Sequence, residues 1–209
     1  MSFETWFAFA LASAVVVAIP GPTVLLVVSY ALGHGRRPAL AIVAGVGLGD
    51  FTAMTASILG IGALLATSAA LFTALKWLGA AYLVYLGVKL WRAPVSADAG
   101  TVEAPAADTR RIFFHAYAVT ALNPKSIVFF VAFLPQFLDP VGPVALQLVA
   151  FEATFLTLAV LNAAAYGLMA TMARGVIRRP AVQKTVNRVG GSLMIGAGLL
   201  AAGWRRVPA

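Results

Sequence analysis

The chain of 209 residues contains no cysteine. A disulfide bond, a thiolate metal site and a cysteine nucleophile are therefore all excluded. The sequence is also poor in charge, because Asp, Glu, Lys and Arg together make up 11% of the residues. Soluble domains carry roughly 25% charged residues. This shortage of charge argues against a chain that is surrounded by water on all sides.

Apolar residues are correspondingly abundant and make up 61% of the chain. The runs 5–33 and 189–204 contain no charged residue, and the runs 38–75, 112–138 and 140–173 contain one each. A helix needs about 20 mostly apolar residues to cross a bilayer. We therefore predict an all-α integral membrane protein whose solvent is the lipid bilayer.

These runs predict six transmembrane helices. The first run is preceded by Glu4 and by no Lys or Arg, unlike a cleavable signal peptide, so we expect it to be retained as a span. Tryptophans lie near several predicted ends, where such rings anchor helices at the membrane interface. The expected spans are 6–32, 39–66, 70–91, 112–137, 143–173 and 187–204.

The net charge of +8 is concentrated in short basic clusters between the apolar runs. Such clusters are typical topology signals, so we expect no nucleic-acid partner. Three Lys and Arg residues fall on one side of the membrane, namely Lys76, Arg205 and Arg206. Eleven fall on the other side: Arg36, Arg37, Lys89, Arg92, Arg110, Arg111, Arg174, Arg178, Arg179, Lys184 and Arg188. Because the positive side is cytoplasmic, we predict a multi-pass inner-membrane protein with both termini external.

The segment 93–111 is rich in Ala, Pro, Asp and Glu, which predicts a flexible cytoplasmic linker. It separates a first half, 1–92, from a second half, 112–209. Each half would hold three spans, an odd number, so the second half is inverted relative to the first. Inverted repeats with interrupted helices are typical of secondary transporters. The sequence therefore predicts two inverted three-helix repeats.

Proline interrupts one predicted span in each half, the first and the fourth. A proline inside a helix removes one backbone hydrogen bond and clashes with the carbonyl four residues back. In lipid, such breaks persist where they face protein or a watery cavity. One proline alone would indicate a packing kink, whereas paired breaks favour a binding site. The breaks consist of Pro20, Gly21 and Pro22, and of Asn123, Pro124 and Lys125.

The apolar runs contain three charged residues, namely Asp50, Lys125 and Glu152. A charge at the bilayer centre costs at least ~2.5 kcal/mol, so it normally faces the bundle interior and has a partner. Asp50 follows Pro22 by 28 residues, and Glu152 follows Pro124 by the same number. We therefore predict that both breaks, both acids and Lys125 converge on one cavity near the midplane.

Each charge in this predicted cavity has more than one interpretation. An acid could carry a proton or bind a substrate amine, and Lys125 could bind a substrate carboxylate or neutralise an acid. A buried ion pair that only fixes helix packing is the structural alternative. Asn162 lies ten residues after Glu152, so it either lines the same face or only joins two helices.

Several motifs resemble the LysE/RhtB family of amino-acid exporters, and the resemblance runs from the first span to the last. The most specific element is Asn123-Pro124-Lys125 with the downstream Phe133-Leu134-Pro135-Gln136-Phe137. The others are Pro20-Gly21-Pro22, Gly49-Asp50, and Leu78-Gly79-Ala80-Ala81-Tyr82-Leu83 with Leu86-Gly87.

The resemblance implies a secondary transporter that exports amino acids or close derivatives, driven by the proton gradient. It points to Pro20–Pro22, Asp50 and Asn123–Lys125 as site residues. Glu152 and Asn162 are added by the repeat and helix-face arguments alone. The expected partners are a small-molecule substrate, protons and the bilayer, and the oligomeric state stays open, a homo-oligomer included.

Two other functions have some support in the residues. A cation or metal-ion transporter would use carboxylate and carbonyl oxygens, but two acids and a lysine supply few ligands for a dication. An intramembrane enzyme would need a His cluster or a Ser–His pair, and both histidines lie near cytoplasmic helix ends. A Ser–Lys pair through Lys125 stays open. We expect no enzymatic activity, no cofactor and no bound metal.

Overall fold

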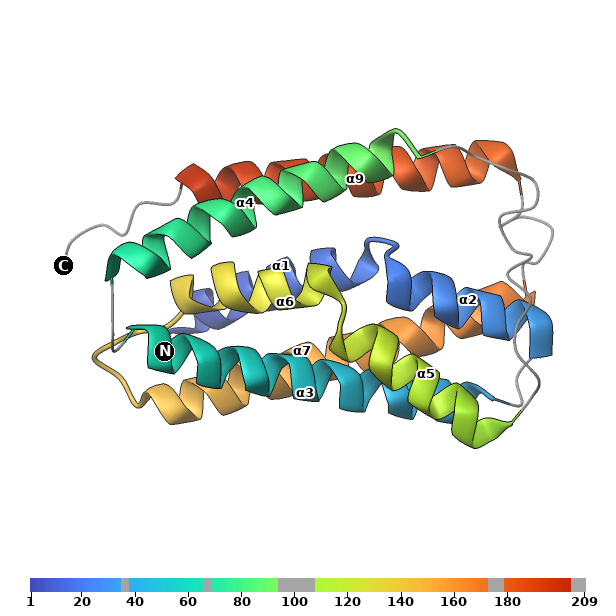
Figure 1. Ribbon diagram of the computed structural model, residues 1–209, viewed down its shortest axis with the longest axis horizontal. Coiled ribbons are helices and arrows are strands. Elements are labelled where there is room, and N and C mark those ends of the chain that lie inside the picture. The colour runs from blue at the N-terminus through green and yellow to red at the C-terminus, as the bar shows by residue number, and fades with distance from the viewer. Residues whose placement is uncertain (35–37, 66–68, 94–107, 173–178, 204–209) are drawn as a thin grey trace.

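The computed structural model describes residues 1–34, 38–65, 69–93, 108–172 and 179–203. Within these ranges the chain is helical and contains no strand, which confirms the all-α prediction (Figure 1). The elements are α1 (Phe3–Ala18), α2 (Pro22–His34), α3 (Ala39–Leu65), α4 (Ala69–Trp91), α5 (Thr109–Ala121), α6 (Pro124–Ala132), the 3-10 helix η1 (Leu134–Gln136), α7 (Val144–Met172) and α9 (Pro180–Gly203).

Helices α3 and α7 are each long and apolar enough to cross a membrane. The pairs α1–α2 and α5–α6 pass the same test together, and each is bent at a short break, by 52° and 41° respectively. Among the described residues there are thus two such helices, or four if each bent pair is one span. Both predicted interruptions are present, whereas α4 and α9 are assigned as spans only by the sequence pattern.

Two helices begin earlier than their apolar runs predict. Helix α5 starts at Thr109, inside the expected linker, because the Asp108 side chain caps it by accepting a 3.0 Å hydrogen bond from the Arg110 N–H. Helix α9 starts at Pro180, seven residues before the expected span, and its first turns are polar. Hydropathy locates only the apolar part of a helix, so polar first turns are missed. The rest of the linker, 94–107, lies outside the described residues.

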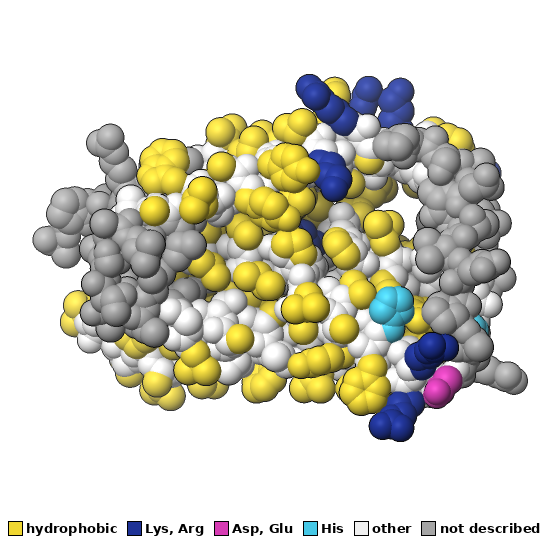
Figure 2. Space-filling model, viewed as in Figure 1, with side chains coloured by type: hydrophobic (Ala, Val, Ile, Leu, Met, Phe, Trp, Pro, Cys, Tyr) yellow, Lys and Arg dark blue, Asp and Glu magenta, His cyan; other side chains and the backbone are white. Residues whose placement is uncertain are grey.

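Seven of the described basic residues gather toward one end of the bundle. They are Lys89 and Arg92 at the end of α4, Arg110 and Arg111 at the start of α5, and Arg179, Lys184 and Arg188 at the start of α9. Figure 2 shows this concentration on the right, and we call it the basic end. The chain begins at the opposite end (Figure 1). Arg36, Arg37, Arg174, Arg178, Arg205 and Arg206 lie outside the described residues.

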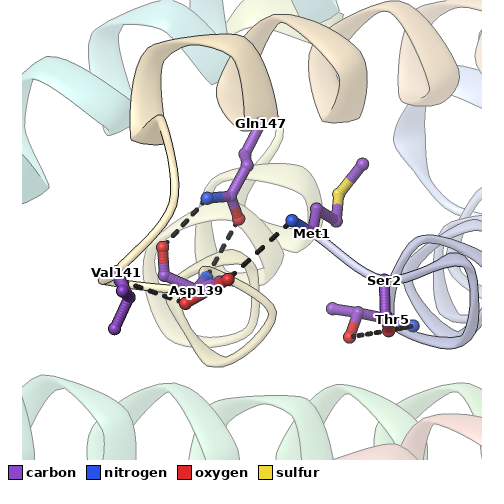
Figure 3. A network of polar contacts seen from close by, with 6 residues as sticks. All are labelled: Met1, Ser2, Thr5, Asp139, Val141 and Gln147. Carbon is purple, nitrogen blue, oxygen red and sulfur yellow. Dashed lines mark hydrogen bonds and ion pairs between the residues drawn. The ribbon is translucent and has the colours of Figure 1, made fainter.

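A polar network at the opposite end fixes the turn that precedes α7 (Figure 3). The Gln147 side chain accepts from the Asp139 N–H and donates to the Asp139 carbonyl, both at 2.9 Å. The N-terminal amine of Met1 lies 3.8 Å from the Asp139 carboxylate, and the Val141 N–H donates to the same carboxylate at 3.0 Å. These bonds tie the start of α1 to the start of α7.

Helices approach closely where glycine removes a side chain. A Cβ atom on Gly45 of α3 would lie 2.6 Å from the Phe113 carbonyl oxygen of α5, and one on Gly49 would lie 2.7 Å from Cβ of Thr120. The same kind of contact joins α4 to α9, which run side by side along one face (Figure 1). The α3–α5 contact also places Asp50 beside the break between α5 and α6.

We predict that Gly45→Val destabilises the fold and that Gly60→Val, on the same helix, does not. The new side chain at Gly45 would meet a backbone oxygen that cannot rotate away, and overpacking of this kind costs typically about 1–3 kcal/mol. Nothing lies within 4 Å of a Cβ atom at Gly60. Thermal unfolding of the purified variants in detergent measures the difference, and equal midpoints would contradict the close-packing interpretation.

Candidate functional site

The candidate site begins with four backbone carbonyl groups that the first break leaves without helical partners. The last four carbonyls of any helix lack an intrahelical hydrogen bond. Here Pro20 and Pro22 have no N–H, so the carbonyls of Val16 and Ala18 could not be satisfied by continuing the helix. We call the carbonyl oxygens of residues 16–19 the carbonyl cluster.

Side chains from the second half of the chain satisfy the whole carbonyl cluster. The ammonium group of Lys125 on α6 donates to the oxygens of Val16 and Ile19, at 2.8 and 2.7 Å. On α7, the amide Nδ2 of Asn162 donates to Val17 at 2.9 Å, and the Tyr166 hydroxyl donates to Ala18 at 2.7 Å. The end of α1 is therefore capped by α6 and α7.

The second break is held by the first half in return. Asn123 caps α6 by accepting from the Lys125 N–H at 3.1 Å, and its Nδ2 donates to Thr23 Oγ1 at 3.2 Å. The Thr23 hydroxyl also lies 3.2 Å from the Thr120 hydroxyl. Pro124 occupies the first turn of α6, where a missing N–H leaves no bond unmade. The first break is thus held by residues that follow Pro124 in the sequence, and the second break by Thr23, which follows Pro22.

Asp50 lies on α3 beside these breaks and is 4% exposed. Its Oδ1 atom is buried and has no hydrogen-bond partner. In the described part of the chain, the terminal amine with Asp139 is the one ion pair within 4.0 Å, so Asp50 does not contact Lys125 directly. A buried polar atom without a partner is unfavourable, which makes Asp50 Oδ1 a candidate acceptor for a ligand.

Asp50, Lys125, Asn123 and Asn162 line one small cavity, together with Thr23, Ser126 and valine and alanine side chains. Its volume is about 30 Å³. One water needs roughly 10–15 Å³ of such space, whereas pockets for small ligands have about 300–1,000 Å³. The cavity therefore has room for two or three waters but not for an amino acid, and we call this arrangement the closed state.

Packed side chains lie on both sides of this cavity along the helices. Toward the opposite end lie buried aromatic rings, among them Phe9, Phe151 and Phe155, with Phe9 and Phe151 4.3 Å apart between ring centroids. Toward the basic end lie Tyr30 and buried aliphatic side chains, and the Tyr30 hydroxyl is 2.9 Å from His115 Nδ1. One of these two barriers would have to open for any solute to enter.

Glu152 is not among the residues that line this cavity, so the structure brings Asp50 and Lys125 together there but not the two acids. Its Oε1 accepts a 2.7 Å hydrogen bond from Thr55, which lies five residues beyond Asp50, about 7.5 Å along the α3 axis. The cause is the connection before α7, where a 3-10 helix and a turn take up several residues. Helix α7 therefore begins too late in the sequence to place Glu152 as deep in the bundle as Asp50. Equal spacing in sequence therefore gave unequal depth.

The remaining predicted residues lie at the breaks themselves. Gly21 lies next to the Lys125 side chain, because a Cβ atom on Gly21 would be 3.4 Å from Lys125 Nζ. Pro20 borders a separate groove between α1 and α9, and Pro22 begins α2. Sequence reasoning did not name Thr23, Thr120, Ser126 or Tyr166 as site residues. The position of Tyr166, four residues after Asn162 and thus on the same helical face, was the available signal.

Comparison with known proteins gives one consistent result. Residues 14–203 match the family model described as LysE type translocator. A homoserine/homoserine lactone efflux protein of Salmonella typhimurium is 35% identical over 98% of this chain and 99% of its own length. An uncharacterized membrane protein of Vibrio cholerae is 35% identical over 97% and 98% of the two chains. A leucine efflux protein of Klebsiella pneumoniae is 30% identical over 86% and 84%. No solved structure matches.

We predict that Tyr166→Phe lowers the stability of the protein, whereas Tyr85→Phe on the exposed face of α4 does not. The first substitution removes only the hydroxyl that donates to the Ala18 carbonyl, and a neutral hydrogen bond of this kind contributes about 0.5–1.5 kcal/mol. Tyr85 is 57% exposed. Thermal unfolding in detergent would show the loss, and an unchanged midpoint for Tyr166→Phe would mean that this cap is dispensable.

Proposed function

We propose that this chain, which belongs to the family of LysE type translocators, exports amino acids or close derivatives across the bacterial inner membrane. Its relatives named homoserine/homoserine lactone and leucine efflux proteins support this substrate class. The structural observation that carries the proposal is the buried Asp50 carboxylate, with one oxygen unpartnered, in a closed cavity between two broken helices.

The cavity offers complementary groups for both ends of an amino acid. Asp50 Oδ1 can accept a hydrogen bond from a substrate ammonium group, and such charge-assisted bonds are among the strongest in proteins. The first turn of α2, with Thr23 and Val24 in the cavity wall, presents backbone N–H groups and the positive end of a helix dipole. That helix end suits a substrate carboxylate.

Proton coupling follows from competition for a single carboxylate. A substrate ammonium binds ionised Asp50, whereas a proton that reaches Asp50 from outside neutralises the carboxylate and displaces the ammonium. The carrier would then return with a neutral Asp50, because an unpaired charge in the membrane interior is costly. Export of one amino acid would in this way be coupled to the entry of one proton.

The proposed architecture is two inverted repeats, residues 1–92 and 112–209, joined by a cytoplasmic linker. Each repeat would contain a bent pair, a long helix and a further helix: α1–α2, α3 and α4, then α5–α6, α7 and α9. The reciprocal support of the two breaks favours this arrangement, as do the contacts of α3 with α7 and of α4 with α9. The basic end would face the cytoplasm.

The alternatives gain no support from the geometry. The described residues contain no group of three or more His, Asp or Glu side chains that could hold a metal ion. Lys125 Nζ donates to two carbonyl oxygens, so it is not positioned to accept a proton from a serine hydroxyl.

We predict that Asp50→Asn lowers efflux from cells preloaded with homoserine or leucine by at least about tenfold, as expected when a charge-assisted hydrogen bond is lost. The residual efflux should no longer respond to the transmembrane pH gradient. Glu152→Gln is the matched control, because it neutralises the acid that lies outside the cavity. Equal effects of the two substitutions, or unchanged pH dependence in Asp50→Asn, would contradict a specific role for Asp50.

We also predict that Thr109→Cys and Val141→Cys are labelled from opposite sides of the membrane. The natural chain has no cysteine, so each variant contains a single thiol. Thr109 starts α5 at the basic end, and Val141, which is 94% exposed, lies in the turn before α7. A membrane-impermeant maleimide should label Val141→Cys in intact cells, and Thr109→Cys only in inside-out vesicles. The reverse pattern would invert the proposed topology.

A further inference from the structure

Lys125 brings a full positive charge into the candidate site, but it does not pair with the acid there. Its side chain is 6% exposed, and its ammonium group donates to two backbone oxygens of α1. Asp50 lines the same cavity with Oδ1 unpartnered. Two opposite charges therefore share one small space without direct contact, although an ion pair would be the simplest way to bury both.

The groups around this space form an acceptor set for an ammonium ion. An ammonium group has three N–H donors, and it is satisfied by oxygen acceptors arranged around it. The carbonyl oxygens of Val16 and Ile19 supply two acceptors, and Asp50 Oδ1 is a third in the same cavity that Lys125 leaves unused. Lys125 therefore uses two of the three acceptors in this set.

Space and charge prevent a substrate from joining Lys125 at this set. The cavity of about 30 Å³ is too small for an amino acid. A second ammonium group beside the first would also be repelled in this poorly solvated interior. Among the residues that line the cavity, Lys125 alone has a long flexible side chain, whereas the others are short side chains such as Val, Ala, Thr and Asn.

We infer that Lys125 occupies the substrate's own ammonium site in the empty transporter, and that a primary ammonium group of the substrate displaces it. The site comprises the oxygens of Val16 and Ile19 together with Asp50. The displaced lysine can then face the substrate carboxylate, so one exchange binds both ends of an amino acid. This inference rests on the proposed function for the identity of the substrate, but the ammonium site itself does not depend on transport.

The exchange also links binding to movement. Lys125 is one of the three side chains by which the second half holds the end of α1, and its bonds to Val16 and Ile19 are the ones that a ligand would replace. Asn162 and Tyr166 would keep α1 attached while Lys125 leaves. A ligand without an N–H donor, such as tetramethylammonium, cannot replace these hydrogen bonds.

A thiol reporter on α1 tests the inference without measuring transport. Ser13 is fully buried one turn before Val16, and Ser13→Cys changes its size little. We expect Lys125→Ala to increase the rate at which methyl methanethiosulfonate modifies this cysteine by at least about tenfold in purified protein, because a charge-assisted contact is lost. Ethylammonium should restore slow modification, and tetramethylammonium and ethanol should not. Lys184→Ala, an exposed lysine on α9, is the matched control.

The outcomes separate the inference from the proposed function. Failure of ethylammonium to slow the modification, or an equal effect of tetramethylammonium, would overturn the ammonium site. Should Lys125→Ala not fold, Lys125→Met keeps the bulk of the side chain without its charge, and an unchanged modification rate in that variant would also overturn it. A positive result combined with absent amino-acid efflux would refute only the proposed transport function.

Discussion

The structure depends on the four carbonyl oxygens that have no helical partner where α1 ends at the proline break. Inside a bilayer no water is present to satisfy them, and each unsatisfied group would cost several kcal/mol. The three side chains that bind them come from α6 and α7, more than one hundred residues further along the chain. The first half therefore cannot bury its own break. The two halves need each other for reasons of hydrogen bonding, in addition to apolar packing.

The bundle is arranged so that this contact is possible. Glycines on α3 have no Cβ atom, so α5 packs directly against the α3 backbone. This close contact places Asp50 beside the second break. The aromatic cluster around Phe9 fills one side of the cavity, and Tyr30 with its aliphatic neighbours fills the other. The polar groups of the two breaks consequently lie in a layer between two mainly apolar regions. In such a layer hydrogen bonds and charges interact strongly, because little solvent screens them.

Stability and transport make opposite demands on this layer. A carrier must hold its breaks closed when empty, yet release some of the same bonds when a substrate arrives. The side chains that cap the carbonyl cluster fall into two groups, one neutral and one charged. The neutral bonds of Asn162 and Tyr166 hold α1 to α7, while the charged group of Lys125 is the one that a substrate ammonium group would replace in the proposed exchange. In that proposal the lysine of the closed state takes the position of the ligand's own ammonium group.

The sequence by itself determined the membrane class, the positions of the helices and the two interruptions, because hydropathy and proline act locally along the chain. It also identified Asp50, Asn123, Lys125 and Asn162 as candidate site residues, since polar groups in apolar spans are few. It could not determine the rotation of each helix about its axis or the depth of each residue, which depend on packing between distant segments. Tertiary structure therefore decided that Lys125 binds backbone oxygens instead of Asp50. It likewise decided that Glu152, equal to Asp50 in spacing, pairs with Thr55 outside the cavity, because the turn before α7 shortens its return to the midplane.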